Sequence, residues 1–140
     1  VLKPGGMACA VVFGAPARNP CIAVLMATAL KHAGLAPRDP WQPGGLVSLG
    51  KPGLLDELFR QAGFREVATT AIDAPFRMKS AAHYLDFVRS SASPIRQILE
   101  RLPAQAAQAA WAEMEERLSA FKTGDGWVGP NELLLTAGRR

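Results

Sequence analysis

The sequence predicts an α/β domain with an incomplete sheet, and three observations lead to this class. Residues 7–13 form an apolar run between Gly6 and Gly14, which is typical of a strand buried on both faces. Several later segments repeat apolar residues at helical spacing. Only two further segments, 67–72 and 132–137, have the composition of strands. A buried central strand needs a neighbouring strand on each side, and this chain contains few segments that could be those neighbours.

Size and charge narrow the class of protein. A chain of 140 residues fits one domain, and 49% hydrophobic residues exclude a disordered tail. The net charge is +4, but the basic residues are scattered and only Arg139 and Arg140 are adjacent. A nucleic-acid-binding protein would gather them on one face, so we expect no nucleic-acid partner.

The cysteines and the lengths of the apolar runs indicate the cellular compartment in which we expect the protein. Cys9 and Cys21 lie in apolar surroundings without CxxC spacing, so we expect buried free thiols in a reducing cytoplasm. No apolar run approaches the ~18–20 residues that span a membrane. No signal peptide is recognisable, and we expect a cytoplasmic protein without a membrane partner.

Turn and cap residues predict the first helices. Asn19-Pro20 begins a helix that Gly34 ends, and residues 35–50 read as a loop. A second helix starts near Pro52 and ends at Gly63. Its predicted buried face comprises Leu54, Leu55, Leu58, Phe59 and Ala62, and Phe64 is expected to fold back on the last turn.

The segment of about 78–123 reads as helical throughout. Ser80 is the expected N-cap of one helix, and Ser93-Pro94 begins another, which Pro103 ends. A long apolar stripe then continues to Phe121, and the turn at 123–126 stops it. This helical segment is inserted between the last two predicted strands.

The order of these pieces resembles part of a known family. Leu2-Lys3-Pro4-Gly5-Gly6 followed by an apolar strand is similar to the fifth-strand region of class I S-adenosylmethionine-dependent methyltransferases. The similarity is closest to the ubiquinone- and menaquinone-biosynthesis C-methyltransferases, the methyltransferase type 11 branch. In that branch a later helix ends in Ala-Gly-Phe, here residues 62–64, and leads into the sixth strand. Each motif alone is weak, but the two in this order are moderately specific.

The resemblance implies a partial Rossmann-like sheet made of strands 5, 6 and 7 of the family. The last strand is then expected to lie between the other two and to run antiparallel. Residues 1–140 correspond to the C-terminal part of one methyltransferase domain, with the segment of about 78–123 as a helical cover. Because the chain begins at Val1 on what looks like a helix end, we expect it to be a cut made inside a larger domain.

The implied function is transfer of a methyl group from S-adenosylmethionine to a small-molecule acceptor. The family binds this cofactor through a glycine-rich turn after its first strand and an acidic residue after its second. Neither element occurs here, and the G-x-G at 124–126 follows a helix rather than a strand. We therefore expect no cofactor-binding or catalytic residue in this chain, and no binding or activity by the chain alone.

Other chemical motifs are weaker. His32 and His83 are expected to be surface or capping residues, and Glu113 lies on a polar helix face that we expect to be solvated. No zinc spacing, phosphate loop or nucleophile elbow appears, so no metal site is predicted.

The resemblance places an apolar acceptor pocket beyond the strand ends and under the helical cover. The candidates for this pocket are Phe13, Asn19, Trp41, Phe76, Tyr84 and Phe87. The alternative is that the aromatic residues belong to an ordinary core and that Asn19 only caps a helix.

A second hypothesis treats the chain as a non-enzymatic, self-associating interaction module. The first strand would lack a neighbour on one edge, and exposed edges recruit other strands. We therefore expect a homodimer, in which the first strands of two copies pair antiparallel.

Overall fold

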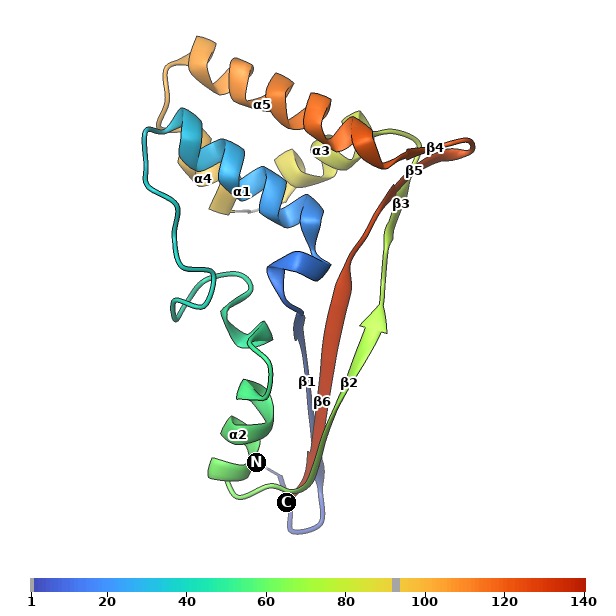
Figure 1. Cartoon of the computed structure of the whole chain (residues 1–140). Helices are drawn as coiled ribbons and strands as arrows, with labels where there is room; N and C mark the ends of the chain where they lie inside the picture. Colours follow the sequence, from blue (N-terminus) through green and yellow to red (C-terminus); the bar gives the residue numbers. More distant parts are fainter. Residues whose placement is uncertain (1, 92–93) are drawn as a thin grey trace. The chain divides into compact units, whose positions relative to one another are not determined.

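The computed structural model describes residues 2–91 and 94–140 of the chain. Val1 and the predicted cap at Ser93 lie outside these ranges. The chain divides into two compact units (Figure 1). The first, called the sheet unit, comprises Val1–Asn19, Asp39–Ala74 and Asn131–Arg140, and the second, called the helical unit, comprises Pro20–Arg38 and Pro75–Pro130.

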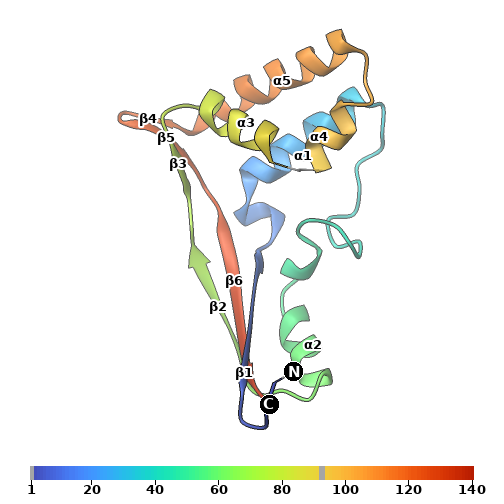
Figure 2. The same ribbon diagram turned by 180° about the vertical axis from the view of Figure 1, so that it is seen from behind.

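The sheet unit contains three strands in the order β1-β6-β2. β1 (Met7–Phe13) and β2 (Arg65–Asp73) both pair antiparallel with β6 (Glu132–Arg139), so they run parallel to each other. Figure 2 shows β6 between its two neighbours. The sequence prediction of an antiparallel last strand between the other two therefore matches the observed order.

One face of this sheet is covered by α2 (Leu54–Gln61). A Cβ atom on Gly138 of β6 would lie 3.1 Å from the Phe59 ring and 3.0 Å from Phe64 Cβ, so helix and strand are in close contact. Gly63 has a φ of +84°, and the Phe64 N–H donates to the Phe59 carbonyl at 3.0 Å. The predicted glycine stop and the returning phenylalanine are both confirmed.

The other face of the sheet is open, which corrects two predictions. Met7 and Val11 are 61% and 54% exposed and Cys9 is also exposed, so β1 is not buried on both faces and only Cys21 is a buried thiol. The residues of β1 alternate in exposure because α2 covers one side of the sheet only. On α2 itself, Leu58 is 40% exposed, and the fully buried position is Leu55.

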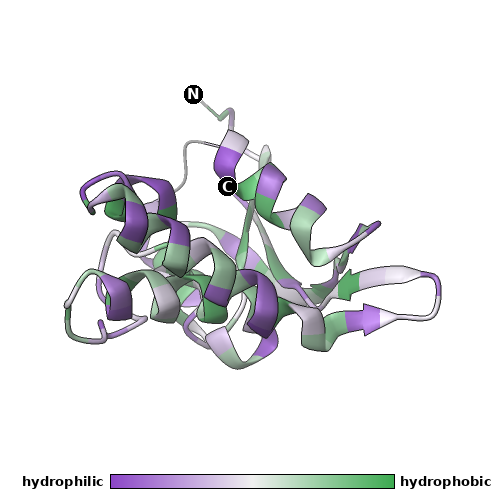
Figure 3. Ribbon diagram, turned by 90° about the horizontal axis from the view of Figure 1, so that it is seen from above, coloured by the Kyte–Doolittle hydropathy of each residue, from purple (hydrophilic) through white to green (hydrophobic). Residues whose placement is uncertain are grey.

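The helical unit consists of α1 (Pro20–His32), α3 (Ala81–Ser90), α4 (Pro94–Leu99) and α5 (Ala104–Leu118). Ser80 caps α3 as predicted, since its hydroxyl accepts from the His83 N–H. Polar and apolar residues alternate along these helices, as Figure 3 shows. Their apolar faces meet in a core that includes Leu25, Leu85, Leu99, Met114 and Leu118.

A second small sheet belongs to this unit and was not predicted. β3 (Phe76–Met78), β5 (Gly126–Gly129) and β4 (Lys122–Thr123) pair antiparallel in the order β3-β5-β4. The prediction that the last helix of this segment continues to the turn at 123–126 was therefore wrong, because α5 stops at Leu118 and β4 follows at Lys122. Strands of two to four residues are too short to show an alternating pattern in the sequence. Within the described ranges, no helix is long and apolar enough to cross a bilayer.

Candidate functional site

A polar cluster lies in the sheet unit where β1 ends, and we call Arg18, Asn19, Asp73 and Glu132 the β1-end cluster. Asn19 is fully buried. Its side-chain Oδ1 accepts from the Glu132 N–H at 3.0 Å, and its Nδ2 donates to the Ala15 carbonyl at 3.1 Å. Asn19 directly precedes α1 at the expected position, but these two bonds fasten the loop after β1 to the start of β6 and do not reach the first turn of α1.

The charged members of the β1-end cluster are paired. Arg18 Nε donates to Glu132 Oε2 at 3.0 Å, and its Nη2 lies 3.9 Å from Asp73 Oδ1. The hydrogen bond and charge of Glu132, and then the charge of Asp73, raise the pKa of Arg18. The Arg18 side chain is still 63% exposed, so the cluster has a fixed, solvent-accessible guanidinium at the carboxyl end of β1. Because two carboxylates already neutralise this charge, the guanidinium can orient a hydrogen-bonding ligand through its remaining N–H groups.

Close backbone contact shapes the same region. The short turn η2 (Ser48–Gly50) lies directly against the end of β1. A Cβ atom on Gly50 would lie 2.2 Å from the Phe13 carbonyl oxygen and 2.8 Å from that of Gly14. Only glycine permits this approach, so the loop of residues 39–50 is held at the strand end although it contains little regular structure.

An aromatic cluster occupies the helical unit, and we define it as Phe76, Tyr84, Phe87 and Trp127. The rings of Tyr84 and Trp127 are stacked with centroids 4.8 Å apart. Phe76 lies 5.2 Å from Tyr84 and 6.1 Å from Phe87. Tyr84 and Trp127 are buried, whereas Phe87 is 48% exposed. The cluster therefore runs from the core to the surface of this unit.

Two titratable groups are buried beside these rings. Burial raises the pKa of the Cys21 thiol to about 12. Burial, and then the neighbouring Cys21, raise the pKa of Tyr84 above its usual range. Both groups stay protonated near neutral pH, so Cys21 is a weak nucleophile and Tyr84 acts through its ring and its hydroxyl dipole.

The structure brings together only some of the predicted pocket residues. Phe76, Tyr84 and Phe87 are in mutual ring contact in the helical unit. Phe13 and Asn19 lie near the end of β1 in the sheet unit. Trp41 belongs to the same unit; it is half-buried, and its backbone N–H donates to Asp39 Oδ1 at 2.9 Å. A single pocket lined by all six residues stays a prediction.

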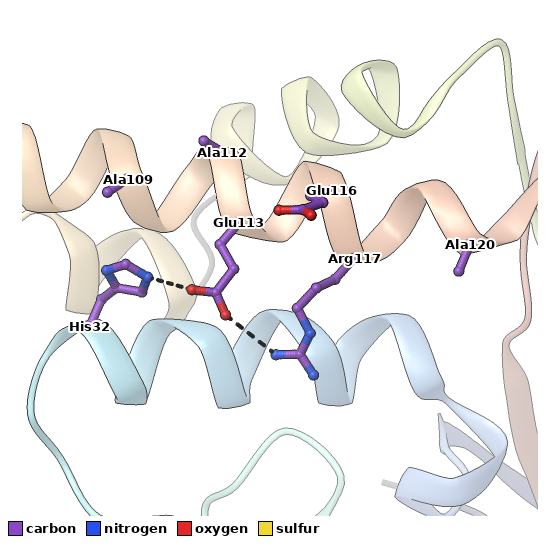
Figure 4. A pocket seen from close by; sticks show the side chains of 7 residues that line it. All are labelled: His32, Ala109, Ala112, Glu113, Glu116, Arg117 and Ala120. Atoms are coloured by element: carbon purple, nitrogen blue, oxygen red, sulfur yellow. Dashed lines mark hydrogen bonds and ion pairs between the residues drawn. The ribbon is translucent and has the colours of Figure 1, made fainter.

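Sequence reasoning missed a charged cluster between α1 and α5. Figure 4 shows His32 and Arg117 converging on the carboxylate of Glu113. His32 Nε2 and Lys31 Nζ each lie 2.8 Å from Glu113 Oε2, and Arg117 Nη1 donates to Thr28 Oγ1 at 2.9 Å. The expectation that Glu113 is simply solvated was therefore wrong, because its carboxylate is paired with α1. His32 is a partly exposed residue at the end of α1, as expected, but its bond to Glu113 was not predicted.

His32, Glu113 and Arg117 line a shallow, open hollow on the helical unit, together with Ala109, Ala112, Glu116 and Ala120. Hydrogen bonds from Lys31 and then His32 lower the pKa of Glu113. Lys31 and His32 of α1 bond to Glu113 of α5, and Arg117 of α5 bonds to Thr28 of α1, so the arrangement joins the two helices. Lys31 and His32 are basic residues in the last turn of α1, which is a common pattern at helix ends, so the sequence alone did not reveal the carboxylate opposite them.

A scan against protein-family models finds no matching family, and a search of curated proteins finds no significant match.

Proposed function

We propose that this chain forms the C-terminal part of a class I S-adenosylmethionine-dependent methyltransferase domain that acts on a small-molecule acceptor. The observation that carries the proposal is the strand arrangement β1-β6-β2, with the last strand antiparallel between two parallel ones. The resembled family places its strands 5, 7 and 6 in this order. Either of the other two strands could have been in the middle, and either pair could have run parallel, so the agreement in both order and direction supports the proposal.

Local features support the same assignment. β1 leaves the turn of residues 3–6, in which the Gly6 N–H donates to the Lys3 carbonyl at 2.9 Å. The helix that crosses over to β2 ends at Gly63 and Phe64, and helices α3 to α5 lie between β2 and β6 in the chain. Turn, crossover helix and inserted helices are thus in the order that the resemblance implies.

In this proposal the two clusters have different roles. The β1-end cluster lies at the carboxyl end of a strand, where α/β sheets bind their ligands. The aromatic cluster supplies an apolar surface for the acceptor through Phe76 and the half-exposed Phe87. Methyl transfer depends mainly on aligning the sulfonium methyl with the acceptor atom, so residues that position the acceptor suffice on this side. The cofactor is held by residues outside the chain.

The coding sequence upstream of Val1 tests the assignment. The proposal predicts a strand followed by a glycine-rich turn there, and a protein that includes it should bind S-adenosylmethionine. Replacing Phe87 with Ala in that protein is expected to raise the KM for the acceptor and leave cofactor affinity unchanged. An unrelated upstream domain, or a stop codon, contradicts the proposal.

A second candidate function is a non-enzymatic interaction module that associates with itself. The observation that favours it is the open face of the sheet unit, where Val11 and Ile72 are 54% and 38% exposed. The same upstream sequence discriminates the two functions, because a module needs no nucleotide-binding turn.

A further inference from the structure

The hydroxyl of Tyr84 is buried in the helical unit and has no hydrogen-bond partner among the described residues. Tyr84 is 2% exposed, and the core to which it belongs contains only residues of this unit. The Trp127 Nε1–H beside it is engaged with the Leu118 carbonyl, and the Cys21 thiol is only a weak donor and acceptor. An unpaired buried hydroxyl costs free energy, and the few that native proteins retain are accounted for by a functional role or by a bound water or ion.

A water molecule is a poor partner for this hydroxyl. Buried waters typically make about three hydrogen bonds, so they need several polar groups around them. The core around Tyr84 is formed by apolar and aromatic side chains and the Cys21 thiol, which offer a water little besides the hydroxyl itself. A loosely held water is readily displaced by a ligand group that fits better. The Tyr84 oxygen is not completely sealed from the surface, so a ligand atom can reach it.

The surroundings of Tyr84 restrict the chemistry of such a ligand. Burial, and then Cys21, raise the pKa of Tyr84, so its hydroxyl is protonated at neutral pH and can donate to an acceptor on the ligand. No charged side chain is buried among the described residues, so a ligand charge would find no compensation and the acceptor must be neutral. The rings of Phe76 and the half-exposed Phe87 lie 5.2 Å and 6.5 Å from Tyr84, so the rest of the ligand should be apolar or aromatic.

We propose that Tyr84 is a specificity-determining residue, which donates a hydrogen bond to a neutral oxygen of a ligand whose apolar part packs against Phe76 and Phe87. A carbonyl, ether or undissociated phenol oxygen has this chemistry. The inference rests on the proposed function, in which this ligand is the methyl acceptor, and the hydrogen bond then fixes the orientation of the acceptor. A molecule of the same shape without the oxygen leaves the hydroxyl unpaired and is discriminated against.

Titration of the chain with two small probes of the same shape tests the proposed hydrogen bond. Acetophenone carries a carbonyl oxygen where α-methylstyrene carries a methylene group, so only acetophenone can accept from Tyr84. NMR shifts of the backbone amides of α3 report the binding of each probe. Acetophenone is expected to bind more tightly, and Tyr84→Phe should weaken its binding by about three- to tenfold and leave that of α-methylstyrene unchanged. Equal binding of the two probes, no binding of acetophenone, or an unchanged acetophenone affinity in Tyr84→Phe overturns the proposal.

The stability of the same variant separates a binding role of the hydroxyl from a structural one. Because the hydroxyl has no partner among the described residues, Tyr84→Phe should leave the urea midpoint of unfolding unchanged or raise it. A clear fall of the midpoint overturns the proposal, since it would mean that the hydroxyl is already paired in the folded protein. Neither measurement uses S-adenosylmethionine, so this site can fail while the methyltransferase assignment, which the upstream sequence tests, still holds, and the reverse is equally distinguishable.

Discussion

The imidazole Nε2 of His32 lies 2.8 Å from Glu113 Oε2, which joins the end of α1 to α5 across 81 residues of sequence. Lys31 reaches the same carboxylate from the same turn. One carboxylate thus holds two basic groups of α1, and the packing of these helices depends on its charge.

Acid should therefore weaken the helical unit through Glu113. Its pKa is lowered from the ordinary 4.5 by Lys31 first and His32 second, so its stabilising effect is present above that value and is lost as pH falls through the folded pKa. Glu113→Gln is expected to lower the free energy of unfolding at pH 7, and the difference from the parent should shrink below pH 4.5. Urea titrations at several pH values measure this, with the exposed Glu115→Gln as control. A difference independent of pH contradicts the role of the charge.

Trp127 should be a main determinant of stability. Its Nε1 donates to the Leu118 carbonyl at 2.6 Å and its ring stacks on Tyr84. Trp127→Phe leaves that buried carbonyl without its donor and opens space, at an expected cost of about 2–4 kcal/mol in urea unfolding. Trp111→Phe is the control, since this ring is only half-buried at the margin of the core and lies under Arg89, and it should cost less than about 1 kcal/mol. Equal losses of unfolding free energy in the two variants would mean that the hydrogen bond from Trp127 to the Leu118 carbonyl contributes nothing to stability.

Two adjacent residues of α2 should differ sharply in how much their truncation to Ala lowers the stability of the protein. Phe59 packs on Phe64, with centroids 5.2 Å apart, and against β6, whereas Leu58 is 40% exposed. Phe59→Ala is expected to cost about 2–4 kcal/mol and Leu58→Ala less than about 1 kcal/mol. Thermal melts compare the variants. If Leu58→Ala is the more damaging, α2 covers the sheet with a different face.

Gly50 should not tolerate a side chain. A Cβ atom there would overlap the Phe13 carbonyl, so Gly50→Ala must displace the loop or the end of β1, and we expect a loss of about 2 kcal/mol or more. Gly124→Ala is the control, because its Cβ would meet no atom within 4 Å, and it should change stability by less than about 0.5 kcal/mol. A harmless Gly50→Ala would show that η2 does not press on β1.

The sequence predicted those parts of the fold that local patterns encode. The apolar run of β1, the Gly63 stop of α2 and the Ser80 cap of α3 each leave a signature within a few residues. The exposure of β1 was not predictable from its composition, because an apolar strand has the same sequence whether or not a neighbour covers it. The structure alone shows which face stays open.

The parts of the site that were missed depend on contacts between distant residues. Glu113 looks like any glutamate on a polar helix face until α1 brings Lys31 and His32 against it. Similarly, the strands of the small sheet are too short for a period, and Trp127 alone does not reveal a strand. The ring contacts among Phe76, Tyr84 and Phe87 agree with their grouping in the predicted pocket, and equally with a core role for Tyr84.

Titration calorimetry with S-adenosylmethionine tests the proposed function most directly. The chain alone is expected to bind with a dissociation constant weaker than ~100 μM, about −5.5 kcal/mol, because its sequence has no glycine-rich turn after a strand like the one through which the resembled family holds the cofactor. The same chain joined to the sequence encoded upstream of Val1 should bind at least about tenfold more tightly. Binding by the chain alone below ~100 μM, or no gain from the upstream sequence in a folded protein, would contradict the assignment.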